Sequence, residues 1–221
     1  QMATLPEYYY YYAGLADKIE GAVVPTSDRR VLNYTMREPL GVVGAITPWN
    51  SPLTLTTSKL APALCAGNTV VIKPSEYTSA TVLRLAELVI EAGFPPGAVN
   101  VVTGFGAEAG QPLVDHPGLA KISFTGSTAT GSRIAASAAS RFIGSTLELG
   151  GKSPNIVFDD ANIANAAMGV VAGIFAAAGQ TCIAGSRVFA QRAIYDELLQ
   201  LVADRASSIR MGNPLDDDTE I

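Results

Sequence analysis

Cysteine is scarce in this 221-residue sequence, and its two cysteines, Cys65 and Cys182, are too few for a disulfide framework in a chain of this size. Thiols that stay free are typical of a reducing compartment, so we predict a cytoplasmic protein. Basic residues are outnumbered, with 15 Lys and Arg against 20 Asp and Glu, and they form no cluster that could neutralise phosphates. This balance argues against a nucleic-acid partner. We predict no metal site.

Uninterrupted apolar segments of membrane-spanning length are also lacking. Two stretches, residues 39–58 and 161–186, carry no charge, but the first holds three prolines and the second holds several amides and many alanines and glycines. We interpret both as buried protein segments and predict no membrane partner. With 48% hydrophobic residues, the chain has enough apolar side chains for a substantial core.

Short β-branched runs alternate with helical patterns from residue 40 onward. The pattern predicts strands at residues 42–47, 69–73, 99–102 and 121–124, and helices at residues 53–66, 78–92, 107–115 and 129–139. Such alternation is typical of a parallel sheet with helices on both faces, an α/β fold. Residues 7–20, which include five consecutive tyrosines, are expected to form a helix, and residues 21–38 a hairpin of two extended segments.

Polar residues gather where the expected strands end. Residues 48–52, 73–76 and 125–128 each follow a strand, and a further strand-like segment, 145–148, ends in Glu148. Because parallel sheets bind ligands at the carboxyl ends of their strands, these segments are candidates for a binding site. Glu148 stands two residues before Gly150-Gly151 and is a candidate general base, although most glutamates in loops are inert.

Cys182 is a candidate nucleophile. It follows Gly179-Gln180-Thr181, and a small, flexible preceding segment allows close approach of a substrate to the thiol and to the cysteine's own N–H. The alternative is an inert, buried cysteine, which is the commoner role of a lone thiol.

Taken together, five motifs resemble those of the aldehyde dehydrogenase superfamily, in the same order and with the same spacing. They are Pro48-Trp49-Asn50, Lys73-Pro74-Ser75-Glu76, Phe124-Thr125-Gly126-Ser127, Glu148-Leu149-Gly150-Gly151-Lys152 and Gly179-Gln180-Thr181-Cys182.

The resemblance implies a Rossmann-like domain formed by residues 1–20 and 40–150, an oligomerisation hairpin at 21–39 and the start of an α/β catalytic domain at 151–221. It implies oxidation of an aldehyde substrate to a carboxylic acid, with Cys182 as nucleophile, Asn50 as oxyanion donor, Glu148 as the base that activates water and Lys59 as an aid to proton movement. An ordinary solvated lysine remains the alternative for Lys59.

The resemblance also implies that NAD is the cofactor. No Gly-x-Gly-x-x-Gly fingerprint occurs. The carboxylate of Glu76 would accept hydrogen bonds from ribose and repel a 2′-phosphate, which favours NAD, with NADP as the alternative. The cofactor-binding residues that the resemblance implies are Thr47, Trp49, Lys73, Ser75, Glu76, Gly106, Gly126, Ser127, Gly131 and Leu149.

Members of the family run to roughly twice this length, so the resemblance implies that the sequence is part of a longer protein that forms a homodimer or homotetramer. Two other functions remain open. One is an enzyme that passes the acyl group to coenzyme A, and the other is a non-catalytic nucleotide-binding fragment or relative.

Overall fold

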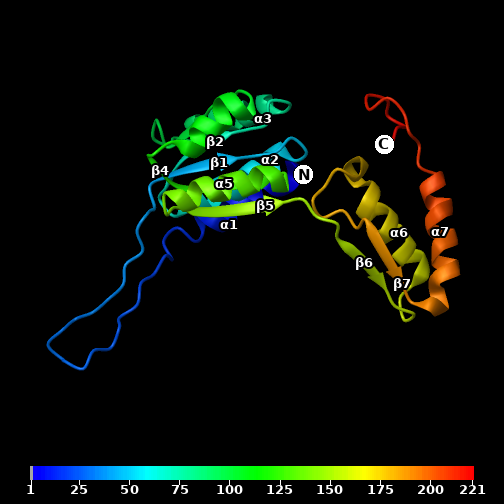
Figure 1. The fold of residues 1–221 in the computed structure, drawn as a ribbon, viewed down its shortest axis with the longest axis horizontal. Coiled ribbons are helices and arrows are strands. Elements are labelled where there is room, and N and C mark those ends of the chain that lie inside the picture. Colours follow the sequence, from blue (N-terminus) through cyan, green and yellow to red (C-terminus); the bar gives the residue numbers. More distant parts are fainter. Residues whose placement is uncertain (1) are drawn as a thin grey trace. The chain divides into compact units, whose positions relative to one another are not determined.

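The computed structural model describes residues 2–221, which divide into two compact units that meet in sequence between Glu148 and Leu149. Each unit is built from a sheet and helices packed against it (Figure 1). No helix in the described part of the chain is both long and apolar enough to cross a membrane.

The first unit is organised around a five-stranded sheet in the order β3-β2-β1-β4-β5. Its strands are β1 (Val42–Ile46), β2 (Thr69–Lys73), β3 (Val99–Val101), β4 (Leu119–Gly126) and β5 (Gly144–Leu149). β1 pairs in parallel with both β2 and β4, and β2 pairs in parallel with β3. The chain therefore builds outward from β1 to β3 and then crosses to the other side of β1 to form β4.

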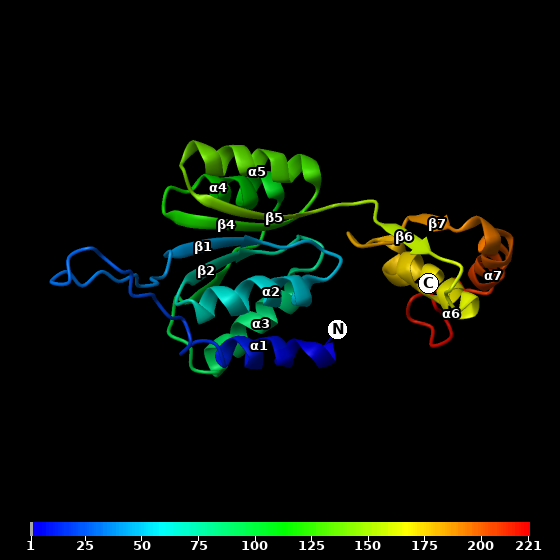
Figure 2. The same ribbon diagram turned by 90° about the horizontal axis from the view of Figure 1, so that it is seen from below.

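Helices cover both faces of this sheet, which confirms the predicted Rossmann-like α/β architecture (Figure 2). One face carries α1 (Leu5–Ala13), α2 (Pro52–Cys65) and α3 (Ser79–Glu91); the other carries α4 (Gln111–Asp115) and α5 (Thr128–Ser140).

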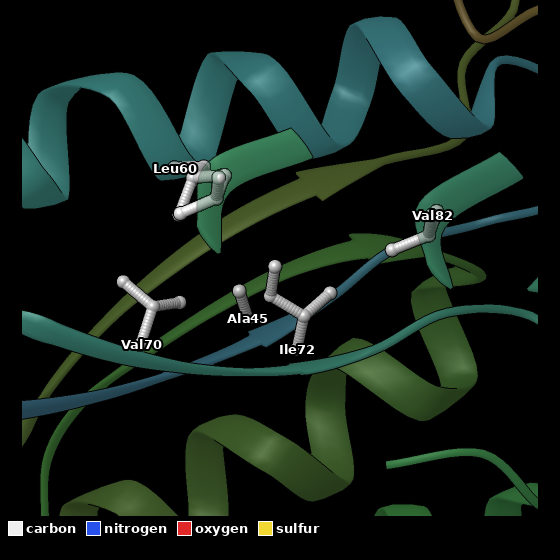
Figure 3. Close-up of a cluster of buried hydrophobic side chains, with 6 residues drawn as sticks. Ala45, Leu60, Val70, Ile72 and Val82 are labelled. Carbon is white, nitrogen blue, oxygen red and sulfur yellow. The ribbon is translucent and has the colours of Figure 1, made fainter. Parts of the chain in front are cut away.

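The core beneath α2 and α3 consists of aliphatic side chains from four elements. Figure 3 shows Ala45 of β1, Val70 and Ile72 of β2, Leu60 of α2 and Val82 of α3 converging there, all of them at most 1% exposed. Burial of each Val, Leu or Ile side chain contributes about 1.5–3 kcal/mol relative to its exposed state. Strands buried on both faces need such continuous apolar runs, which is why they could be predicted from the sequence.

Two helices of the first unit differ from their expected form. The helix expected at residues 7–20 ends at Ala13, and Gly14 begins a series of turns. The helix expected at 107–115 begins as a π-helical turn, Gly106–Gly110, before α4. In both segments a glycine stands at the point of departure, where its lack of a side chain weakens the α-helix.

Residues 18–40 form an extended arm between α1 and β1. Val23 and Tyr34 make an antiparallel bridge, supported by hydrogen bonds from Val24 N to Asn33 O (2.8 Å) and from Thr35 N to Ala22 O (2.8 Å). This confirms the expected pair of extended segments. Nearly every residue of the arm is exposed, so no core within residues 2–221 covers its apolar side chains.

The second unit is a small β-α-β structure. β6 (Pro154–Val157) and β7 (Arg187–Ala190) pair in parallel, and α6 (Ile163–Phe175) connects them through a short 3-10 turn, Ala176–Gly179. A second short turn, Arg192–Ile194, leads into α7 (Tyr195–Ser207), and the two helices share a core of Val157, Ala167, Val170, Ile194 and Leu198.

The expectation that residues 161–186 are buried is wrong for this chain. Only Ala167, Val170, Val171 and Ala184 are buried there, whereas Met168 is about half exposed. The reason is geometric, because α6 has only the two-stranded sheet and α7 to pack against within the second unit, and the rest of its surface remains open.

Candidate functional site

The candidate binding site of the first unit lies at the carboxyl ends of its parallel strands. Ile46 of β1 is in register with Lys73 of β2 and with Phe124 of β4, so the segments that follow these residues leave the sheet at the same edge. The Thr47 N–H donates to the Lys73 carbonyl at 3.1 Å, which keeps the first two segments together. Strand order reverses between β1 and β4, and such a reversal opens a crevice for ligands.

Lys73 and Glu76 form an ion pair at this edge. The Lys73 side chain is almost completely buried, and its Nζ lies 3.4 Å from Glu76 Oε2. The Glu76 side chain is about a third exposed. The pKa of Glu76 is lowered mainly by a hydrogen bond from the residue's own backbone N–H to its carboxylate. Lys73 lowers this pKa further, whereas desolvation raises it. Glu76 is therefore an ionised acceptor at neutral pH. Ser75, between them, accepts a 3.4 Å hydrogen bond from Tyr77 N.

The end of β4 leads directly into the N-terminus of α5. Ser127 is the N-cap of α5, and its Oγ accepts a hydrogen bond from Thr130 N at 3.2 Å. Gly131 N donates to Ser127 O at 2.9 Å, and no acidic residue occupies the first turn of α5. A helix N-terminus of this kind favours an anionic group through its open N–H groups and its dipole.

Thr125, next to Gly126, is a polar group that sequence reasoning did not single out. It is only 6% exposed, and within residues 2–221 its hydroxyl has no hydrogen-bond partner. An unpaired hydroxyl at this depth is costly unless a ligand or water satisfies it. Its position in the motif Phe124-Thr125-Gly126-Ser127 was a signal, but its burial could be known only from the fold.

Asn50 lies between β1 and α2, and Lys59 lies in the middle of α2. Asn50 is partly exposed in the bend before α2, beside Trp49, which is 45% exposed. Lys59 is only 8% exposed. Burial lowers the pKa of Lys59, and the negative charge of Glu148 acts in the opposite direction. Glu148, itself exposed near the end of β5, is thus the acidic group whose charge reaches Lys59.

Gly106 begins the π-helical turn that follows β3, and it is exposed, with nothing within 4 Å of the position a β-carbon would take. Single π-helical turns are frequent at functional sites.

Cys182 and Leu149 belong to the second unit. Cys182 is an exposed, free thiol in a turn between α6 and β7, so it is not a buried cysteine in the second unit. Within residues 2–221, no backbone group accepts a hydrogen bond from its N–H. The turn is preceded by Ala177 and Ala178 with left-handed φ values of 52° and 53° and by Gly179 at 73°. A left-handed alanine costs roughly 1–2 kcal/mol, so this segment is strained.

The described residues hold no group of three or more His, Cys, Asp and Glu side chains that could hold a metal ion.

Comparison with known proteins extends these observations. The model of the aldehyde dehydrogenase family matches residues 1–221. The chain is 52% identical over 220 residues to (Z)-2-((N-methylformamido)methylene)-5-hydroxybutyrolactone dehydrogenase of Acinetobacter baylyi. The matched region covers all of this chain and 45% of that relative. It is 50% identical over 206 residues to cytosolic aldehyde dehydrogenase 1 of Mus musculus, covering 93% of this chain and 41% of that protein.

Solved structures of aldehyde dehydrogenases share the fold of this chain. The NAD⁺ complex of aldehyde dehydrogenase from Bacillus cereus matches with a TM-score of 0.95 and 45% identity, over 99% of this chain and 44% of that one. The chain thus spans less than half the length of the relatives it matches. With five motifs in order, a family match along its whole length and this shared fold, the chain belongs to the aldehyde dehydrogenase family.

Proposed function

We propose that the protein to which this chain belongs oxidises an aldehyde to a carboxylic acid with NAD. The observation that carries the proposal is the family match over residues 1–221, together with the presence of Asn50, Glu148 and Cys182 in the family's motifs. The NAD⁺ complex of the Bacillus cereus relative, which shares the fold, supports the choice of cofactor.

The first unit fits NAD at the edge described above. The ionised Glu76, held by Lys73, would accept hydrogen bonds from ribose hydroxyls, and the N-terminus of α5 with Gly126, Ser127 and Gly131 would receive the pyrophosphate. The unpaired hydroxyl of Thr125 at the same strand end is consistent with a ligand there.

The other proposed contacts come from residues around this edge and from the start of the second unit: Thr47, Trp49, Ser75, Gly106 and Leu149. A carboxylate at Glu76 disfavours the 2′-phosphate of NADP.

Cys182 is the proposed nucleophile of the reaction. Its thiolate would attack the aldehyde carbon, and the Cys182 N–H and the Asn50 side-chain amide would stabilise the resulting oxyanion. Bound NAD supplies the hydride acceptor. Loss of the hydride converts the adduct on Cys182 to a thioester, and Glu148 would then take a proton from the water that hydrolyses it.

Lys59 is proposed to assist proton movement around this chemistry. A lysine whose pKa is lowered by burial gives up its proton more readily than a solvated one, and for Lys59 this effect of burial is larger than the opposing effect of the Glu148 charge.

Two substitutions in the intact protein test the mechanism. Cys182→Ala should abolish aldehyde oxidation and leave NAD binding intact, because the thiol is needed only for chemistry; Cys65→Ala serves as the matched control. Substantial turnover by Cys182→Ala would remove this residue from its role.

Glu148→Gln should allow one turnover and block hydrolysis of the thioester, which produces a burst of NADH and then a stall. Absence of the burst would contradict the assignment of Glu148 to the second half-reaction. Product analysis with and without coenzyme A separates hydrolysis from acyl transfer, and NAD binding without any thiol-dependent oxidation would indicate a non-catalytic relative.

The domain roles are part of the same proposal. Residues 1–20 and 40–150 would bind the nucleotide, and residues 151–221 would begin the catalytic domain. The hairpin at 21–39, within the arm, would join subunits of a homodimer or homotetramer in the cytoplasm. The arm's exposed apolar side chains, such as Val31, Leu32 and Met36, support an interface. Leu32→Asp should lower the molecular mass measured by light scattering, and an unchanged mass would refute this role of the arm.

A further inference from the structure

The turn that carries Cys182 is held within the second unit from more than one side. Before it stands the left-handed segment Ala177, Ala178 and Gly179. After it, the N–H of Gly185 donates to the carbonyl of Gly173 on α6 at 3.0 Å. Ala184, between Cys182 and Gly185, is buried. The turn therefore has little freedom to shift along the chain at either end.

Gly151 is a third element of the second unit that lies close to this turn. A β-carbon built on Gly151 would lie 3.2 Å from the carbonyl oxygen of Cys182, closer than side chains normally approach. Its neighbour Gly150 has nothing within 4 Å of the same position. The two glycines are adjacent and chemically identical, yet only one of them lies against the backbone of the cysteine.

The chain beyond Gly151 is itself fixed in place. Arg187 at the start of β7 donates from Nε to Lys152 O at 2.9 Å and from its N–H to Ser153 O at 3.4 Å. Directly after these contacts, Pro154 pairs with Arg187 at the start of the sheet. These contacts limit movement of the backbone that follows residue 151, so a side chain added there would press on the Cys182 carbonyl.

We propose that Gly151 is a positioning residue for Cys182: the absence of a side chain at 151 lets the Cys182 peptide adopt the place from which its thiol and N–H act. The proposal rests on the proposed role of Cys182 as nucleophile. Movement of the Cys182 carbonyl by a few tenths of an ångström turns the peptide that follows Cys182 and displaces the cysteine's α-carbon and sulfur. A misplacement of about 1 Å costs on the order of a hundredfold in rate, so a shift of a few tenths of an ångström should cost less, about tenfold.

The test compares Gly151→Ala with Gly150→Ala in the intact protein. Gly151→Ala should lower kcat by about tenfold or more, with the KM for NAD changed less than about twofold, because the effect acts on the nucleophile and not on nucleotide binding. Gly150→Ala should leave both within about twofold of the parent protein.

A second readout does not depend on turnover. The rate at which iodoacetamide alkylates Cys182 is measured by peptide mass spectrometry, with Cys65 in the first unit as the internal reference. The ratio of the two rates should change by about threefold or more in Gly151→Ala and should stay constant in Gly150→Ala. Gly150→Ala, in the same segment of the second unit, controls for a substitution that only destabilises that unit.

Ala178→Gly provides a rescue. Glycine removes the left-handed strain before the turn and lets it yield, so Gly151→Ala/Ala178→Gly should recover part of the lost kcat and of the parent alkylation ratio. If Gly151→Ala alone does not fold, Gly151→Ala/Ala178→Gly is compared with Ala178→Gly: a lower kcat and a changed alkylation ratio in the double variant are expected, and equal values in the two variants overturn the proposal.

Equal behaviour of Gly151→Ala and Gly150→Ala in both readouts also overturns it. A changed alkylation ratio in Gly151→Ala, combined with full turnover by Cys182→Ala, would retain the positioning contact and refute the nucleophile instead.

Discussion

Tyr9 is expected to be the only structurally important hydroxyl among the five consecutive tyrosines at 8–12. Its Oη lies 3.1 Å from the Oγ1 of Thr57 on α2, and Thr57 is completely buried. Tyr10, one residue on, is 79% exposed. Tyr9→Phe should therefore destabilise the first unit, whereas Tyr10→Phe should be neutral.

The magnitude follows from the burial of the partner. Removal of the Tyr9 hydroxyl leaves that of Thr57 without this partner inside the protein, and a buried hydroxyl that loses its hydrogen bond costs about 1–1.5 kcal/mol. Thr57→Val removes the other partner, and the double variant should recover about 0.5–1 kcal/mol of the summed loss, which is the coupling energy of the pair.

Urea unfolding followed by the fluorescence of Trp49 is the assay. Trp49 is the only tryptophan within residues 1–221 and lies in the first unit, so among these residues its signal reports on that unit. Equal free energies of unfolding for Tyr9→Phe and Tyr10→Phe would refute the reasoning.

The same pair gives a pH dependence. Burial raises the pKa of Tyr9 above 10.0, so the unfolded chain loses this proton first as the pH rises. The free energy of unfolding should then fall above about pH 10, and Tyr9→Phe should remove that part of the slope.

Four further substitutions test other parts of the first unit. Glu76→Ala should weaken NAD binding more than NADP binding, while Glu87→Ala on the exposed side of α3 should affect neither; equal weakening of both cofactors would contradict the assigned preference. Because burial lowers the pKa of Lys59, the free energy of unfolding should rise with pH between that lowered value and 10.5; urea titrations should show that Lys59→Met loses this rise, and an unchanged profile would contradict the cause. Leu60→Ala should cost about 3–5 kcal/mol in the same titrations, and a loss below about 1 kcal/mol would argue against the core of Figure 3. Phe142, 97% exposed with φ of 58°, should be replaceable by Asn with a gain of about 0.5–1 kcal/mol, detected as a higher Tm.

The strands of the first unit could be predicted because local sequence determines them. The runs that became β1 and β2 are apolar on both faces, and only a buried parallel strand fits them. β6 and β7 were not predicted, since each has four residues and forms only by pairing with the other across α6. Short strands of this kind depend on tertiary contacts that a linear pattern does not contain.

The candidate site could be predicted as a set of residues but not as a set of contacts. Glu76 was singled out by its place at a strand end and by resemblance, and Lys59 through resemblance alone. The ion pair of Glu76 with Lys73, the influence of Glu148 on Lys59 and the approach of Gly151 to Cys182 depend on how distant segments pack. The strand ends were informative because the parallel topology brings them to one edge whatever the details of packing.

The central place of β1 in the sheet has a consequence for synthesis on the ribosome. Val43 pairs with Val70 of β2 on one side and with Lys121 of β4 on the other. During synthesis, one edge of β1 can therefore pair as soon as β2 has emerged, whereas the other edge must wait for β4. A nascent chain that has emerged only as far as β3 exposes the second edge as a row of unpaired N–H and C=O groups. Unpaired edges of apolar strands promote aggregation, so a pause in translation before residue 119 should increase the demand for chaperones, and a pause after residue 126 should not.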